Sequence, residues 1–314
     1  MSGESAFLSL LRAMAPDPAA RGLMDDAAVL DVGGTRLVLT SDTLVEGVHY
    51  LPDDPPDSIG WKLTAVNLSD LAAKGAIPRG CLMNYALSGD PEWDAAFLSG
   101  LRAALERFAM PLLGGDTVAM PKGAPRSFTL TAIGEASPGP VPSRSGARLG
   151  DLLYVTGPVG DAGAGLRLLR EGAAAPATLI DAYRRPTPRL AQGQRLAPHV
   201  TAMMDISDGL LIDAGRMAQA SGLGVIIDAI PLSDSLSTLV GNGPDARVVA
   251  AVAGDDYELL FALPPGLALP VAAHLVGRFT ASPGLALSLD GAAVVLPAAL
   301  GYEHGTGSGP RGDP

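Results

Sequence analysis

Aspartates recur in short polar segments beside apolar runs, and these are the residues best suited to chemistry. The segments are MDDAAVL at Asp25 and Asp26, LTSDTL at Asp42, NLSDLAAKGA at Asp70, LLGGDT at Asp116, MMDISDGL at Asp205 and Asp208, and AGDDYELLF at Asp255 and Asp256. Strands that end in such turns would direct carboxylates into a shared crevice at the edge of a sheet. A carboxylate there must be solvated, paired or bound to a metal ion, because an unpaired buried charge is very costly.

Basic residues look too few to neutralise this set. The chain has 22 Lys and Arg against 33 Asp and Glu, a net charge of -11, and lysine stands only at Lys62, Lys74 and Lys122. Mg²⁺ is the natural alternative, since it takes oxygen ligands from a few carboxylates, waters and substrate phosphates. Metal ions between acidic side chains and a polyphosphate are typical of phosphoryl-transfer enzymes. Gly114 and Gly115 would let backbone N–H groups approach such a phosphate.

The familiar nucleotide-binding signatures are missing from the sequence. There is no GxxxxGK[ST] segment and no Gly-Lys dipeptide, which argues against a P-loop NTPase. There is also no HRD or DFG set, which argues against a protein kinase.

Each motif also has a purely structural interpretation. Asp25, Asp26 and Asp42 could form turns or cap helices, and GGDT is a common turn. Ser207 or Asp205 could cap a following helix, and Asp70 could pair with Lys74 one helical turn later. His49 could be a surface residue, and Tyr302 could pack a C-terminal segment. The recurrence of such motifs in one chain favours a common site.

Composition excludes several other classes of protein. An acidic chain with a pI near 4.7 and no basic cluster predicts neither a nucleic-acid partner nor a membrane-surface segment. Hydrophobic residues make up 47% and the mean hydropathy is +0.27, so a large core is expected.

The single cysteine, Cys81, excludes an intramolecular disulfide and suits a reducing cytoplasm. The N-terminus lacks the features of a signal peptide. Prolines break the uncharged stretch between residues 258 and 278, which predicts a strand, a turn and a short buried helix rather than a membrane span.

Alternating strand and helix patterns predict an α/β (α+β) architecture with two domains. Helices are expected at residues 4–15, 58–74, 91–108, 162–170, 188–196 and 208–221. Strands are expected at residues 27–31, 36–40, 79–87, 127–133, 152–155, 201–204, 225–228, 248–252 and 258–263. The Pro-, Gly- and Ser-rich stretch 138–150 would separate domains at 1–137 and 151–304, and residues 305–314 would be a disordered tail.

The motifs, in this order, resemble those of the thiamine-monophosphate kinase family. The resemblance rests on DDAAVL, TSDTLVEGVHYLPD, KLTAVNLSDLAAKGAIP, LLGGDT, SRSGARLGD, DISDGLLIDAG and GDDYELLF, and it covers residues 25–302. The superfamily also contains aminoimidazole ribonucleotide synthetase, selenophosphate synthetase and a hydrogenase maturation factor. The resemblance implies an N-terminal α/β domain that dimerises through its sheet, a C-terminal α/β domain, and a nucleotide in the cleft between them.

A reaction and its residues are also implied by this resemblance. ATP would phosphorylate thiamine monophosphate to thiamine diphosphate, the last step of that cofactor's biosynthesis, in a cytoplasmic homodimer. The implied ligands of several Mg²⁺ ions are Asp26, Thr40, Ser41, Asp42, Asp70, Asp116, Asp205 and Asp208. Of these, Asp42, Asp70, Asp116 and Asp205 would be catalytic through the metal ions. The implied ATP contacts are Gly115, Asp116, Arg144 and Ser207, and the implied substrate contacts are His49, Asp255 and Tyr302.

The chemistry of these side chains agrees with the implied roles. The planar guanidinium of Arg144 suits phosphate binding. Tyr302 could stack on a cationic thiazolium ring, worth about 0.5–2 kcal/mol, and Asp255 could face the same positive charge. The phosphate nucleophile is already ionised at neutral pH, so in-line attack on the γ-phosphorus would need no general base.

The sequence departs from the family pattern at two positions. Met24 stands where a glycine usually precedes the aspartate pair, and Asp255 stands where glutamate is common. A selenophosphate synthetase would need a reactive Cys or selenocysteine near the N-terminus, and a hydrogenase maturation factor a C-terminal cysteine; neither is found. A non-catalytic nucleotide- or Mg²⁺-binding protein and a metal-dependent phosphatase stay open as alternatives.

Overall fold

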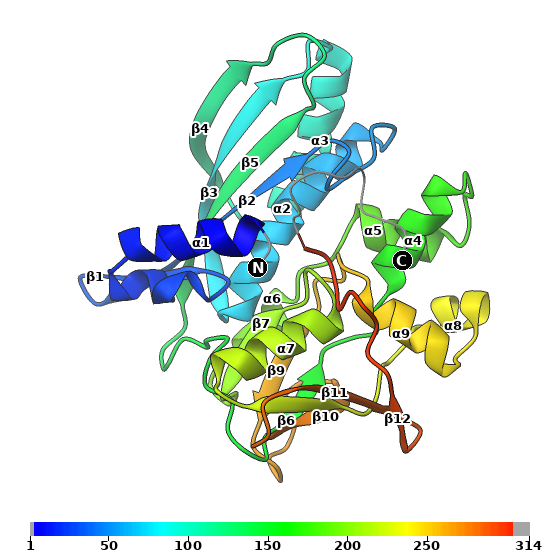
Figure 1. Ribbon diagram of the computed structural model, residues 1–314. Helices are drawn as coiled ribbons and strands as arrows, with labels where there is room; N and C mark the ends of the chain where they lie inside the picture. Colours follow the sequence, from blue (N-terminus) through cyan, green and yellow to red (C-terminus); the bar gives the residue numbers. More distant parts are fainter. Residues whose placement is uncertain (1–2, 304–314) are drawn as a thin grey trace.

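Two sheets, one in each half of the chain, organise the molecule (Figure 1). The computed structural model describes residues 3–303, with side chains from residue 7 onward. The N-terminal sheet has the strand order β1-β2-β5-β3-β4. Its strands are β1 (Ala28–Val32), β2 (Thr35–Val45), β3 (Ala76–Leu87), β4 (Leu112–Ala119) and β5 (Ser127–Ala136). Helix α1 (Gly3–Met14) and the 3₁₀ helix η1 (Pro18–Leu23) precede it.

Helices α2 (Pro56–Ala73) and α3 (Pro91–Arg107) pack together and supply the apolar core of the N-terminal half. Leu63 and Leu71 of α2 and Phe97 of α3 are buried with Phe128 and Leu130 of β5. Nearly all of α2 is buried, including its polar residues, because other elements surround it. The edge strand β4, in contrast, is exposed along its whole length.

The C-terminal sheet is larger, with the strand order β12-β11-β8-β10-β6-β9-β7. Its strands are β6 (Leu152–Val155), β7 (Ala202–Asp205), β8 (Gly224–Ile227), β9 (Leu259–Leu263), β10 (His274–Thr280), β11 (Gly284–Leu289) and β12 (Ala292–Val294). Its helices are α4 (Asp161–Arg170), α5 (Ala177–Arg184), α6 (Leu190–Leu196), α7 (Leu210–Ala220), α8 (Asp234–Val240) and α9 (Pro244–Val252).

The C-terminal end of α2 joins the two halves. Ala72 and Ala73 are buried in one cluster with Met203 of β7 and Phe261 of β9. Helix α6 approaches so closely that a Cβ on Gly193 would lie 2.0 Å from the Ala72 carbonyl oxygen, which only glycine avoids. Asp70 and Lys74 are therefore held against the strand that ends at Asp205.

The predicted fold class is confirmed, because both halves are mixed α/β units with a sheet of their own. Cys81, in β3, is buried. The predicted strand at residues 248–252 is wrong, since this segment is the end of α9. The short buried helix predicted after Pro265 is also wrong, because the chain runs through turns into β10.

Two motifs expected in turns lie inside strands instead. Ser41 and Asp42 belong to β2, and Asp116 belongs to β4.

The predicted tail, residues 305–314, lies outside the described residues. Among the helices of residues 3–303, none combines the length and the apolar character that crossing a bilayer requires.

Candidate functional site

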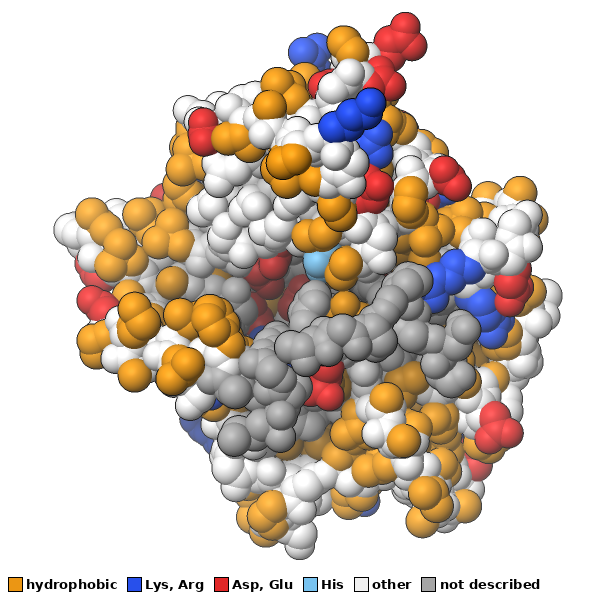
Figure 2. All heavy atoms as spheres, turned by 45° about the horizontal axis from the view of Figure 1, so that its top comes forward, with side chains coloured by type: hydrophobic (Ala, Val, Ile, Leu, Met, Phe, Trp, Pro, Cys, Tyr) orange, Lys and Arg blue, Asp and Glu red, His pale blue; other side chains and the backbone are white. Residues whose placement is uncertain are grey.

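Carboxylates from both halves meet between the two sheets, and we call Asp42, Asp70 and Asp205 the acidic cluster. Asp42 comes from β2, Asp70 from α2, and Asp205 from the end of β7. Figure 2 shows acidic side chains gathered in a hollow near the centre of one face. Thr40 Oγ1 donates to Asp70 Oδ2 at 2.5 Å, and Ser69 Oγ donates to Asp205 Oδ2 at 2.6 Å.

The carboxylates of this cluster have raised pKa values. Burial, with a contribution from the neighbouring charge of Asp26, raises the pKa of Asp42 to about 6, although a hydrogen bond with Asp70 acts in the opposite direction. Burial also holds the pKa values of Asp70 and Asp205 well above their usual range, with nearby carboxylates adding to the effect. No Lys or Arg is among the main causes of these shifts, and none of the described residues forms an ion pair with Asp42, Asp70 or Asp205. The acidic cluster therefore lacks a protein cation and is suited to an external one.

The neighbouring Asp25 and Asp26, the paired aspartates, are neutralised by the protein. Lys74 Nζ hydrogen-bonds to Asp25 Oδ1 and lies 2.8 Å from Asp26 Oδ2. Arg21 lies 2.6 Å from Asp25 Oδ2, and Arg144 lies 2.5 Å from Asp26 Oδ1. Burial alone would raise the pKa of Asp25, but Lys74 and Arg21 hold it well below its usual value. The expectation that basic residues would not pair with the aspartates is thus wrong here.

The turn from β7 to α7 carries Asp205, Ser207 and Asp208. Asp208 pairs with Arg216 at 2.5 Å, and its backbone N–H donates to Asp213 Oδ2 at 3.1 Å. Gly209, at φ 127°, precedes α7 without a side-chain cap, so the capping role considered for Ser207 or Asp205 is wrong. Burial raises the pKa of Asp213 to about 6.

Two of the predicted substrate contacts are joined through Lys62. Its buried ammonium group donates to the His49 carbonyl and to Asp255 Oδ2, both at 3.0 Å. Lys62 also lies 4.0 Å from the centre of the Tyr183 ring. The Asp255 N–H donates to the Ser207 carbonyl at 2.8 Å, which links this group to the β7–α7 turn.

Tyr302 approaches the same turn from the C-terminal segment. Its backbone N–H donates to the Asp208 carbonyl at 2.9 Å. Asp255 and Tyr257 adopt left-handed φ angles of 70° and 51°, which are rare outside glycine. Strained backbone that is maintained by its surroundings is often found at functional sites.

Three predicted residues are not brought to the acidic cluster within one chain. The Ser41 hydroxyl pairs with Thr131 Oγ1 at an exposed position. Gly115 and Asp116 lie on the edge strand β4, where Asp116 is exposed and accepts only a local N–H from Thr117 among the described contacts. Asp42 aligns with Leu130, Leu130 with Met83, and Met83 with Gly115. Three strand spacings separate β2 from β4, or about 14 Å.

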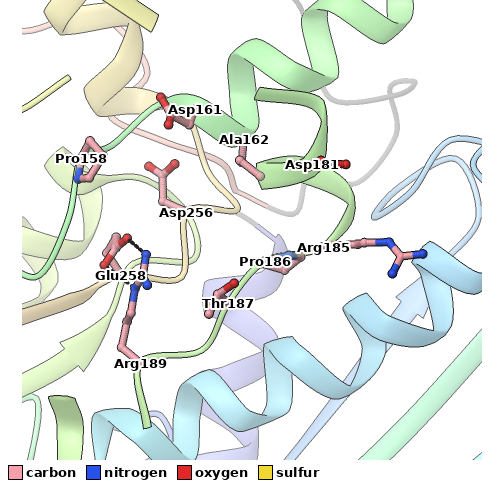
Figure 3. A pocket seen from close by; sticks show the side chains of 11 residues that line it. Pro158, Asp161, Ala162, Asp181, Arg185, Pro186, Thr187, Arg189, Asp256 and Glu258 are labelled. Atoms are coloured by element: carbon pink, nitrogen blue, oxygen red, sulfur yellow. Dashed lines mark hydrogen bonds and ion pairs between the residues drawn. The ribbon is translucent and has the colours of Figure 1, made fainter. Parts of the chain in front are cut away.

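A separate pocket of about 260 Å³ lies beside the turn that carries Asp255 (Figure 3). Asp256 faces the start of α4 and accepts the Gly160 N–H at 2.8 Å. Glu258 accepts the Arg189 Nε–H at 2.9 Å and the Thr156 hydroxyl at 2.6 Å. Glu258 is therefore neutralised by Arg189, which distinguishes it from the carboxylates of the acidic cluster.

The donor set of the acidic cluster fits Mg²⁺. Among the described side chains, no three His, Cys, Asp or Glu groups are arranged so that they could hold a metal ion by themselves. Mg²⁺ commonly binds through one or two carboxylates and takes its remaining ligands from water and phosphates. Buried carboxylates without a protein cation match this pattern, and such ions would let two phosphate-bearing molecules approach one another.

Sequence reasoning missed several residues that support the site, namely Lys62, Ser69, Lys74 as a partner of the paired aspartates, Asp213 and Arg216. Lys62 and Lys74 could have been found, because a lysine in an otherwise apolar helix needs a buried partner. The alternative in which Asp70 pairs with Lys74 is not found, because Lys74 pairs with Asp25 and Asp26 instead.

Comparison with known proteins places this geometry in context. The family model described as AIR synthase related protein, N-terminal domain, matches residues 24–136, and the corresponding C-terminal domain model matches residues 148–290. The thiamine-monophosphate kinase of Escherichia coli strain K12 is 39% identical over 302 residues, covering 90% of this chain and 91% of the relative. That of Salmonella typhimurium is 41% identical over 252 residues, covering 77% and 76%.

Solved structures share the overall fold of this chain. The structure described as AaThiL complexed with AMPPCP and TMP has a TM-score of 0.85 at 30% identity, with 96% of this chain and 97% of that chain covered. The hydrogenase maturation protein HypE of E. coli has a TM-score of 0.68 at 24% identity, covering 95% and 98%. At that identity HypE shares the fold alone.

Proposed function

This chain belongs to the thiamine-monophosphate kinase family of AIR synthase related proteins, and we propose that its acidic site transfers the γ-phosphoryl group of ATP to thiamine monophosphate. The products are thiamine diphosphate and ADP. The observation that carries the proposal is the convergence of Asp42, Asp70 and Asp205 from both halves into one group, in which Asp205 is buried, Asp42 and Asp70 are half-buried, and none is paired with a Lys or Arg of the described residues. Two anionic substrates can meet there only if cations lie between them and the carboxylates.

The ligand set proposed for Mg²⁺ comprises Asp26, Thr40, Asp42, Asp70, Asp205 and Asp208, with Asp116 contributed as described below. Ser41 is left out of this set, because its hydroxyl pairs with Thr131 at an exposed position. When bound, the metal ions would neutralise the phosphates of both substrates. Thr40 and Ser69 orient Asp70 and Asp205 through the hydrogen bonds that they donate. Asp26 Oδ1 becomes available when Arg144 turns from it toward a nucleotide phosphate.

The chain positions two reactants rather than supplying a proton acceptor. A phosphate oxygen of thiamine monophosphate attacks the γ-phosphorus in line, the bond to the β-phosphate oxygen breaks, and ADP leaves. The attacking phosphate is already ionised at neutral pH, so no side chain has to remove a proton. Gly115, Arg144 and Ser207 are the proposed ATP contacts, and orientation and charge stabilisation provide the rate enhancement.

His49, Asp255 and Tyr302 are the proposed contacts of the thiamine moiety. Asp255 forms an ion pair with Lys62, so the carboxylate proposed to face the thiazolium ring is held in place by a buried ammonium group. Asp255 is one methylene shorter than the common glutamate, so its carboxylate extends less far from the backbone. The position in which Lys62 holds it therefore decides whether it reaches the thiamine moiety. The backbone of Tyr302 is hydrogen-bonded to Asp208. From this position the Tyr302 ring can stack on the cationic heterocycle.

A homodimer would complete the site. The N-terminal sheet exposes many apolar side chains, which a partner would cover: Leu30, Val32, Ile77, Leu82, Leu87, Leu112, Leu113 and Val118. Since Asp116 lies about 14 Å from Asp42 of its own chain, estimated from strand spacing, it can serve the acidic cluster only from a second copy.

Mixed dimers test that part of the proposal. Asp42→Asn and Asp116→Asn are inactive alone, but their heterodimer keeps one intact site if Asp116 acts in the partner. Co-expression would restore up to about a quarter of the wild-type activity, because half of a random dimer population is mixed and each mixed dimer has one intact site of two. No recovery in purified heterodimers would place Asp116 outside the partner's site.

The proposed reaction is tested by identifying its products. Purified protein with ATP, Mg²⁺ and thiamine monophosphate should form thiamine diphosphate and ADP in equal amounts, identified by mass. Binding of ATP without turnover would indicate a non-catalytic nucleotide-binding protein. Release of phosphate from thiamine monophosphate without ATP would indicate a phosphatase. A cytoplasmic location stays a prediction.

A further inference from the structure

Lys74 lies at a point where three oxygen atoms from two chain segments surround one buried cation. Its ammonium nitrogen contacts Asp25 Oδ1, Asp26 Oδ2 and the Met203 carbonyl oxygen, the last two at 2.8 and 3.2 Å. The Lys74 side chain is 0% exposed, and those of Asp25 and Asp26 are 3% and 1% exposed. Two carboxylate oxygens and a carbonyl oxygen are also the ligand types that a hard divalent ion prefers.

This cation joins the segments that carry the acidic cluster. Lys74 caps the C-terminal end of α2, one helical turn beyond Asp70. Met203 lies in β7, two residues before Asp205. The ammonium group therefore connects the polar segment before β1, the end of α2 and the strand that presents Asp205.

Asp26 Oδ2 depends on Lys74 for its charge compensation. This oxygen is buried and receives no hydrogen bond from the described residues. Its contact with Lys74 Nζ is an ion pair by distance, without the geometry of a hydrogen bond. The other oxygen, Oδ1, is bound by Arg144. A buried carboxylate oxygen without a hydrogen-bond donor is unfavourable. Removing Lys74 would therefore leave the negative charge of Asp26 Oδ2 uncompensated, and another cation could bind in its place.

We propose that Lys74 is a built-in cation of the site, which takes the place of one divalent metal ion at Asp25 Oδ1 and Asp26 Oδ2. The acidic cluster is left to bind the ions that carry the substrate phosphates. Lys74 is thus a positioning residue, because it touches neither substrate and acts through the carboxylates that it holds. The inference rests on the proposed function only in requiring that the site binds divalent cations.

The test counts bound Mn²⁺ by electron paramagnetic resonance on the full chain with AMPPCP. Lys74→Met removes the charge at similar length and should bind one more Mn²⁺ per chain than the wild type. Lys74→Arg keeps the charge and should bind the wild-type number. Lys122→Met, at an exposed position in the turn between β4 and β5, is the matched control and should also bind the wild-type number.

Thermal unfolding supplies a readout that does not depend on activity. In EDTA, Lys74→Met should unfold at a lower temperature than the wild type, and Mn²⁺ should recover most of the loss. If this variant does not fold, Lys74→Gln carries the same prediction, since its amide can still donate to the Met203 carbonyl.

The outcomes separate this inference from the proposed function. An unchanged Mn²⁺ count in both uncharged variants, or failure of both to fold even in Mn²⁺, would make Lys74 a packing residue and overturn the inference. The proposed function would stand, provided that the wild type binds Mn²⁺ with AMPPCP. If the wild type binds none, beyond the ion carried by free nucleotide, the metal-dependent function itself fails.

Discussion

Two groups of carboxylates lie side by side in this site, and they differ in what neutralises them. The paired aspartates, Asp25 and Asp26, contact Lys74, Arg21 and Arg144. The acidic cluster has hydroxyl donors from Thr40 and Ser69. The pKa of Asp25 is accordingly lowered, whereas the pKa values of the acidic cluster are raised.

The difference separates carboxylates that the protein itself neutralises from carboxylates that we propose to bind metal ions. Asp26 belongs to the first group and offers a metal ion only the Oδ1 atom that Arg144 now contacts. Where the protein provides its own cations, a buried carboxylate contributes to folding and fixes the chain. Where it provides none, the carboxylates store an unfavourable interaction that bound cations relieve. The same substitution, aspartate to asparagine, should therefore have opposite effects in the two groups.

The largest effect is expected from Asp205→Asn. Loss of a metal-binding carboxylate should lower kcat by at least about 100-fold, in the range seen when one group that stabilises transition-state charge is removed. Thiamine diphosphate formation at saturating Mg²⁺ measures it. Asp290→Asn, at an exposed residue paired with Arg247, is the control and should keep full activity. Near-normal turnover of Asp205→Asn would remove this residue from the metal site.

Asp25→Asn should instead act on stability. It leaves the buried Lys74 with one carboxylate fewer, and breaking a buried ion pair of this kind costs about 3 kcal/mol. Urea denaturation in EDTA measures the loss in the free energy of unfolding. Asp70→Asn under the same conditions should lose nothing or gain, because it removes a like charge from the acidic cluster. Equal losses in both variants would erase the distinction between the two groups.

Metal removal should make stability depend on pH. A carboxyl group whose pKa is raised by folding, such as Asp42 from 3.8 to about 6, binds more protons in the folded state between those values. Stability in EDTA therefore falls as the pH rises through this window, so Tm should be lower near pH 7.5 than near pH 5. Mg²⁺ should recover Tm near pH 7.5 and have little effect near pH 5. A Tm that rises with pH in EDTA would contradict the raised pKa values.

A smaller effect is expected at Tyr302. Tyr302→Ala should raise the KM for thiamine monophosphate about tenfold, within the range of a cation–π contact, and change the KM for ATP little. Steady-state kinetics with each substrate varied measures the two values. Equal increases in both would place Tyr302 outside the thiamine contact.

The sequence predicted the fold class and the carboxylates, because both depend on local patterns. Apolar periodicity identified α2 and most strands, and the aspartates stood out beside them. Residues 248–252 form a short apolar run, and such a run does not distinguish a strand from a helix. In the structure they are the second half of α9, which begins at Pro244. The partners of the aspartates were missed because Lys74 and Asp25 are far apart in sequence and are joined only by tertiary packing.

Asp116 shows a second limit of local reasoning. Its GGDT motif indicates a phosphate contact, but the motif carries no information on which chain the contact serves. Only the strand register, which aligns Asp116 with Asn84 at the edge of the sheet, separates it from Asp42.

Anomalous scattering from a crystal grown with Mn²⁺ and AMPPCP tests the contrast between the two groups most directly. Manganese peaks are expected beside Asp42, Asp70 and Asp205, with Lys74 Nζ still between Asp25 and Asp26. Peaks that replace Lys74 at the paired aspartates, with none at the acidic cluster, would contradict this contrast.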